Sequence, residues 1–280
     1  MDAFEDILTV FYFVIGFFAV GQCINWLELF YLYQSREFHE EGFFAWKILR
    51  LDTPKFRVRG SNAIPGLLDY LFNGRRFRIL LFIYLFAIIG LVVFHAYSAG
   101  FTCCAFVLVL AMIAIQLRYT FGGEGSDQMN VILIFSLFAG FGFFSSHRMS
   151  EYAIFFIAGQ SCLSYFSAGI AKLISTQWRK GDAVFRIFNT GTFGNARVSR
   201  FLVDRKRLCL FLSWSVIIAE CLFPLSILLS PKMILVFIIW GFCFHLLNAI
   251  VMGLNVFLWS FLATYPCIIY TAARIGWHLF

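Results

Sequence analysis

Long apolar runs alternate with short polar stretches along the whole chain of 280 residues. A helix that crosses a membrane needs about 20 consecutive apolar residues, so runs of roughly 17 to 25 are taken as spans. The pattern predicts eight helices, at residues 7–32, 79–97, 100–117, 129–146, 152–174, 208–230, 233–252 and 255–273. The run from 233 to 273 is too long for one span, and Gly253 divides it. The chain is therefore predicted to be an all-α, polytopic membrane protein.

The composition supports this prediction. Hydrophobic residues make up 61% of the chain and charged residues 13%, whereas a soluble domain has about 25% charged residues. The first run follows an acidic start and is too long for a cleaved signal peptide. No soluble domain of ordinary size remains, so residues 1–280 are taken as one transmembrane domain whose chemistry is built from its helices and loops.

The basic residues are unevenly distributed between the loops. The loop after the first span holds nine of the 22 Lys and Arg residues, and the loop after the fifth span holds eight. Loops rich in Lys and Arg stay in the cytoplasm. Both loops are therefore predicted to be cytoplasmic and both termini external, in a multi-pass protein of the cell membrane.

The two basic loops also contain aromatic and aliphatic residues, at 43–49, 64–72 and 183–188. This mixture is typical of short amphipathic helices that lie on a membrane with Lys and Arg toward anionic headgroups. The net charge of +7 is then explained by the lipid bilayer as partner, and no folded basic module indicates nucleic-acid binding. The eight cysteines lie in apolar stretches without zinc spacing, so no metal site is predicted.

Several polar residues within or beside the spans are candidates for function. Lys172 lies near the end of the fifth span, roughly one turn inside the point where charges become frequent. The predicted topology places Ser126 and Asp127, which precede the fourth span, on the same side of the membrane. His245 and Asn248 are three residues apart on the seventh span and share one side of it. The pattern predicts a polar pocket at one end of the bundle.

Each of these residues also has a structural interpretation. The Lys172 side chain can extend along the helix to the headgroups. His245 can form a hydrogen bond that ties two helices together. Glu220, four residues before Pro224, can accept hydrogen bonds from backbone groups that the proline leaves free, or it can pair with a cation.

Two segments resemble a known family. The segment "YFSAGIAKLISTQWRKG" (165–181) resembles the signature of the HTTM (horizontally transferred transmembrane) domain, which is shared with the vitamin K-dependent gamma-carboxylase. The segment "FHLLNAIVMGLNVFLWSFLATYP" (244–266) is similar to a second segment of that carboxylase in its Phe-His, Asn, Phe, Leu-Ala and Pro positions. With the number of spans, the resemblance covers about residues 75–275.

The resemblance implies that Lys172 is a base that starts the oxygenation of a reduced quinone such as reduced vitamin K. Surroundings of low dielectric favour the neutral amine of a lysine, which is the form that a base requires. With the polar pocket, this gives Lys172, His245 and Asp127 as candidate catalytic residues. The candidate substrate-binding residues are Ser126, Trp178, Asn248 and Glu220.

The family also includes stand-alone bacterial proteins that resemble the membrane protein for maturation of a sporulation-delaying toxin, and the length of this chain favours that group. The preferred hypothesis is a membrane enzyme or peptide-maturation subunit that uses Lys172 on a quinol-like or peptide substrate. A small secreted peptide or a companion maturation protein would then be its partner. One alternative is a non-catalytic membrane carrier or partner-binding subunit. A second alternative is a true vitamin K-dependent glutamate carboxylase.

Overall fold

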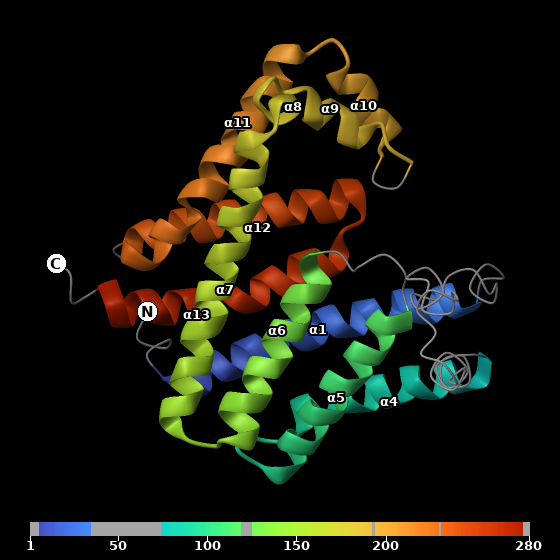
Figure 1. Cartoon of the computed structure of the whole chain (residues 1–280), viewed down its shortest axis with the longest axis vertical. Helices are drawn as coiled ribbons and strands as arrows, with labels where there is room; N and C mark the ends of the chain where they lie inside the picture. Colours follow the sequence, from blue (N-terminus) through green and yellow to red (C-terminus); the bar gives the residue numbers. More distant parts are fainter. Residues whose placement is uncertain (1–5, 35–73, 119–124, 192–193, 230, 277–280) are drawn as a thin grey trace, which may run out of the picture. The chain divides into compact units, whose positions relative to one another are not determined.

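A computed structural model describes residues 6–34, 74–118, 125–191, 194–229 and 231–276, which are largely helical (Figure 1). The long helices are α1 (Ile7–Gln34), α4 (Gly74–Val93), α5 (Ala99–Arg118), α6 (Gly125–Leu137), α7 (His147–Ile174), α11 (Lys206–Leu222), α12 (Pro231–Met252) and α13 (Asn255–Gly276). The short helices are α8 (Thr176–Arg179), α9 (Asp182–Phe188) and α10 (Ala196–Leu202). A π-helical turn, η4 (Phe138–Phe143), extends α6, and a 3₁₀ helix, η5 (Phe223–Leu228), follows α11.

Eight helical segments of the described residues are long and apolar enough to cross a membrane. They begin and end within a few residues of the predicted spans, and α12 and α13 meet at Gly253 as predicted. Gly253 has a φ of +77°, a backbone conformation that glycine adopts without steric cost. The all-α, polytopic prediction is confirmed, and the fold is that of a multi-pass membrane protein.

The ends of the second span differ from the prediction. The helix α4 begins five residues earlier than expected and ends at Val93 instead of residue 97. Ser98 begins the next helix, because its hydroxyl accepts a hydrogen bond from the backbone N–H of Phe101 at 3.1 Å, as an N-cap residue does. Hydropathy marks the apolar part of a chain, whereas caps set the helix ends. Apolar Phe94 and Tyr97 therefore extend the run beyond the helix.

The proline in the sixth span also changes the helix type. The α-helical part of this span ends at Leu222, and Pro224 lies in the first turn of η5. Proline lacks the N–H that would continue the α-helical ladder. The remainder of the predicted span therefore continues as a 3₁₀ helix.

The chain divides into two compact units, Ile15–Ser150 and a unit made of Glu151–Phe280 with Met1–Val14. In the first of these, hydrogen bonds cross between α1 and α4. The Trp26 indole N–H donates to the backbone carbonyl of Leu81 at 2.9 Å, and the Asn25 amide donates to the Tyr84 hydroxyl at 3.2 Å. Such polar ties replace the hydrophobic driving force that two helices lack within lipid.

The second unit contains α8 to α13 and most of α7. Near its C-terminal end, α7 lies beside α11, and the short helices α8 to α10 lie against the N-terminal half of α11 (Figure 1). The predicted amphipathic helix at 183–188 is present as α9. The helices predicted at 43–49 and 64–72 fall outside the described residues.

Candidate functional site

An ion pair joins α7 to α11 inside the second unit. The Lys172 ammonium donates to both carboxylate oxygens of Glu220, at 2.9 and 2.7 Å. The Glu220 side chain is 4% exposed and the Lys172 side chain 19%. The ammonium also lies 5.3 Å from the centre of the Trp178 ring, within the range of a cation–π interaction. Of the two alternatives for Glu220, the structure shows the pairing with a cation.

Gly169 permits the two helices to approach each other at this ion pair. A Cβ atom at Gly169 would lie 2.8 Å from the backbone nitrogen of Cys221, which is closer than real Cβ atoms come to backbone. Gly169 is three residues before Lys172, so both lie on the same side of α7. The glycine therefore lets the backbone of α11 come close enough for the ion pair.

A chain of three hydrogen-bonded side chains begins at Tyr165 on α7, about two turns before Lys172. The Tyr165 hydroxyl is 2.6 Å from Nε2 of His245 and 2.9 Å from the Tyr265 hydroxyl. The Tyr165 ring stacks on Phe223, with 3.7 Å between the ring centres. A Cβ atom at Gly241 would collide with the Tyr265 hydroxyl and lie 3.1 Å from that of Tyr165. Gly241 therefore leaves the room that the two hydroxyl groups occupy.

His245 is enclosed by aromatic rings. It is 1% exposed and its ring stacks on Phe261, with 4.6 Å between the centres, while Phe244 and Phe257 lie on other sides. Its Nδ1 atom has no hydrogen-bond partner among the described residues. Since imidazole can accept or donate at either nitrogen, the chain from Tyr265 to His245 can carry hydrogen bonds in either direction.

The ion pair and the tyrosine–histidine chain are close enough to influence each other. Tyr165 and Lys172 are seven residues apart, about 10.5 Å along the helix, on the same side of α7. In an interior of low dielectric, charges interact over about this distance. A proton that moves within one group would therefore change the energy of the other.

Replacing Tyr165 with phenylalanine should destabilise this unit by about 1–2 kcal/mol, because stacking on Phe223 is kept while the hydroxyl is lost. Nε2 of His245 and the Tyr265 hydroxyl would lose a buried partner. Unfolding of the purified protein in mixed micelles, followed by tryptophan fluorescence, measures the change. Tyr152→Phe is the matched control, because Tyr152 lies on the same helix and is 58% exposed. Equal stability of the two variants would contradict the role of the Tyr165 hydroxyl.

The structure places the other predicted site residues as follows. Asn248 is half-buried one turn after His245 on α12. Ser126 and Asp127 lie at the start of α6 in the other unit, where Ser126 is buried and the Asp127 carbonyl accepts a hydrogen bond from Gln116 at 3.3 Å. The meeting of Asp127 with Lys172 and His245 stays a prediction.

Sequence reasoning missed Tyr165 and Tyr265. Tyr165 stands seven residues before Lys172, a spacing that puts both on one side of a helix. That spacing is the signal that could have identified it. Tyrosine is common in apolar sequence, however, and its hydroxyl group does not interrupt a hydrophobic run. Tyr265 belongs to a helix whose approach to Tyr165 depends on tertiary packing.

Comparison with models of known families, with curated proteins and with solved structures finds no match for this chain.

Proposed function

We propose that this chain is a membrane enzyme, or the membrane subunit of a peptide-maturation system, in which Lys172 and Glu220 exchange protons with a lipid-soluble or peptide substrate. The observation that carries the proposal is the bond of the Lys172 ammonium to both oxygens of the buried Glu220 carboxylate. Ionisable groups inside a membrane are costly and usually serve function.

Lys172 and Glu220 carry opposite charges, so the pair can supply a base without leaving one charge buried alone. A proton that passes from the ammonium to the carboxylate leaves a neutral amine beside a carboxylic acid. The amine then accepts a proton from an acidic O–H of the substrate, and the product pair is an ammonium ion and a substrate anion. General bases contribute about 10²–10⁴-fold to a rate, and a quinol-like hydroxyl is a suitable proton donor.

The tyrosine–histidine chain supports this proposal. Tyr165, His245 and Tyr265 provide hydrogen-bonding groups in a site lined by aromatic rings, which suits a flat apolar substrate with polar atoms. The buried Nδ1 of His245 has no hydrogen-bond partner among the described residues, and imidazole nitrogen can take up a proton. The segments 165–181 and 244–266, which resemble HTTM proteins, contain Lys172 and the three residues of the tyrosine–histidine chain, and we propose membership of that family on these two segments.

Lys172→Arg tests the proposal. Arginine keeps the positive charge and the pairing with Glu220, but it does not give up its proton at ordinary pH. The wild-type protein and the variant are placed in lipid nanodiscs with a reduced naphthoquinone, and products are measured by mass spectrometry. Lipid and peptide extracts of cells that express each protein are compared in the same way. The product of the wild-type protein should fall by about 100-fold or more in the variant.

The same experiment separates the enzyme from the carrier. A passive carrier or partner-binding subunit needs only the charge of Lys172 and should keep its extract profile with arginine. Equal profiles for the wild-type protein and a folded Lys172→Arg variant would contradict proton transfer by Lys172. Elution as a single species in size-exclusion chromatography shows that the variant is folded.

A further inference from the structure

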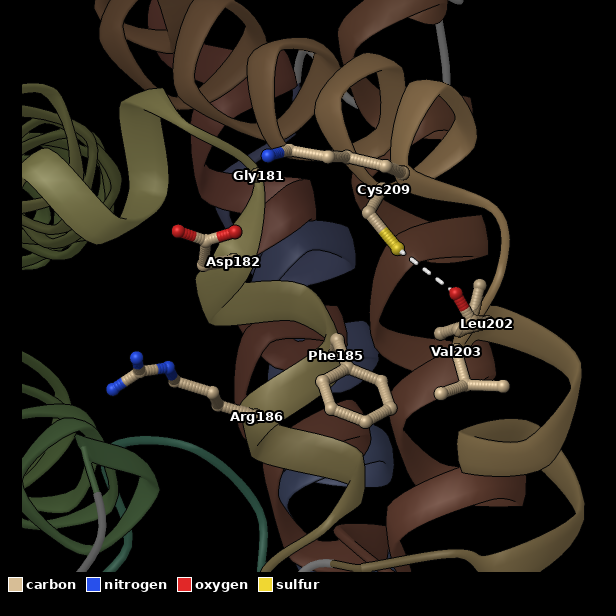
Figure 2. Close-up of a pocket in the computed structure, with 8 residues that line it drawn as sticks. Gly181, Asp182, Phe185, Arg186, Leu202, Val203 and Cys209 are labelled. Carbon is tan, nitrogen blue, oxygen red and sulfur yellow. Dashed lines mark hydrogen bonds between the residues drawn. The ribbon is translucent and has the colours of Figure 1, made fainter.

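The segment between α7 and α11 encloses a pocket that takes no part in the proposed chemistry. The pocket has a volume of about 350 Å³, within the range of about 300–1,000 Å³ that is usual for small-molecule sites. It lies between α9 and the end of α10 and the start of α11 (Figure 2). Because this segment connects the ends of two spans, the pocket lies where lipid headgroups are found.

The walls of the pocket are held by a small folded core. Val184, Leu202 and Cys209 are buried together, and the Cys209 thiol donates to the Leu202 carbonyl at 3.8 Å. Gly181, the N-cap residue of α9, has a φ of +79°, and a Cβ atom there would lie 2.7 Å from the backbone of Leu210. The close contact of α9 with α11 therefore requires glycine, and the pocket is a built feature of the fold.

Two cations at the pocket lack a compensating charge. Arg186 and Lys206 line it and are exposed, and no carboxylate of the described residues lies within ion-pair distance of either. Asp182 is the one acidic residue in the lining. From Arg179 to Arg207 the chain has eight basic residues against two acidic residues. This charge balance favours an anionic ligand.

Part of the lining of the pocket is apolar. Figure 2 shows Asp182 and Arg186 extending from one side of α9, whereas Phe185 lies on the side of Leu202 and Val203. Val203 is 56% exposed, and the neighbouring Phe201 is 54% exposed. A free phosphate ion gains nothing from contact with apolar side chains. The glycerol and first methylene groups of a phospholipid, in contrast, can pack against them.

We propose that this pocket binds the headgroup of an anionic phospholipid, with the phosphate near Arg186 and Lys206 and the glycerol end against Phe185, Leu202 and Val203. The site would fix the cytoplasmic connection between α7 and α11 to the membrane surface. It is independent of the chemistry proposed for Lys172.

Native mass spectrometry of the protein in mixed micelles, titrated with phosphatidylglycerol or phosphatidylcholine, tests the site. The wild-type protein should bind phosphatidylglycerol about tenfold more tightly than phosphatidylcholine. Arg186→Gln with Lys206→Gln should remove most of this preference. The matched control is Arg197→Gln with Arg200→Gln, which removes the same charge from exposed positions of α10 outside the pocket. The control should change the affinity by less than about threefold.

A second variant tests the pocket by a different route. Val203→Asp adds a carboxylate at an exposed apolar position of the pocket. It should weaken the binding of phosphatidylglycerol by about tenfold, because the carboxylate repels the lipid phosphate. Equal losses in the pocket variant and the control would overturn the site in favour of diffuse surface charge. Absence of a lipid preference, or displacement of the lipid by millimolar inorganic phosphate, would also overturn it.

Discussion

Replacing Glu220 with leucine is expected to lower the free energy of unfolding by about 3 kcal/mol. The carboxylate is nearly inaccessible and binds the Lys172 ammonium with both oxygens. Removal of one partner from a buried ion pair leaves the other charge without compensation, which costs about 3–5 kcal/mol. The lower end applies because Lys172 is 19% exposed. Unfolding in mixed micelles with increasing sodium dodecyl sulfate measures the loss.

A double variant and a control complete this test. Lys172→Met together with Glu220→Leu removes both charges, and its loss should be well below the sum of the two single losses. Glu151→Gln is the control, because Glu151 pairs at 3.6 Å with Arg274, whose side chain is 51% exposed, and glutamine can still accept the hydrogen bond of Tyr270. Its loss should be about 1 kcal/mol or less. Additive losses at Lys172 and Glu220 would show that the two side chains are not coupled.

Replacing Gly169 with alanine is the second change for which a large effect is expected. The added methyl group would lie 2.8 Å from the backbone nitrogen of Cys221. A side chain could relieve such a contact by changing its rotamer, but the backbone cannot. The helices α7 and α11 would have to separate, with loss of the Lys172–Glu220 contact. Overpacking costs about 1–3 kcal/mol, and the weakened ion pair adds to this. The variant should unfold at a lower concentration of sodium dodecyl sulfate, and it should also lose the activity proposed for Lys172.

Gly159→Ala is a matched control for this variant. Gly159 lies on the same helix, ten residues earlier, and a Cβ atom there would have nothing within 4 Å. Alanine favours a helix over glycine by about 1 kcal/mol, so this variant should be as stable as the wild-type protein or more stable. Equal behaviour of the two alanine variants would contradict the close approach at Gly169.

The helices could be predicted from sequence because the bilayer imposes a single requirement on every span. Each needs about 20 apolar residues, and the eight runs show this requirement directly. The ends were harder to predict, since Ser98 and Pro224 act through one hydroxyl group and one missing N–H. These local details leave the hydropathy of a run unchanged.

The charged and imidazole residues of the candidate site could be identified from the sequence, but their contacts could not. A charged residue stands out in apolar sequence, so Lys172, Glu220 and His245 could all be identified as candidates. Which of them meet depends on where helices approach closely, and that is set by small residues such as Gly169 and Gly241. The pairing of Lys172 with Glu220 was left open for this reason, and Tyr165 was not identified.

Three polar side chains of α7, Ser161, Tyr165 and Lys172, bond to helices that follow it in the chain. The last of their partners, Tyr265, is translated one hundred residues after Tyr165. A newly made α7 would therefore enter the membrane before any of these groups can be satisfied, at a cost that lipid alone does not compensate. This side of α7 therefore finds its partners within the protein only when synthesis of the chain is nearly finished.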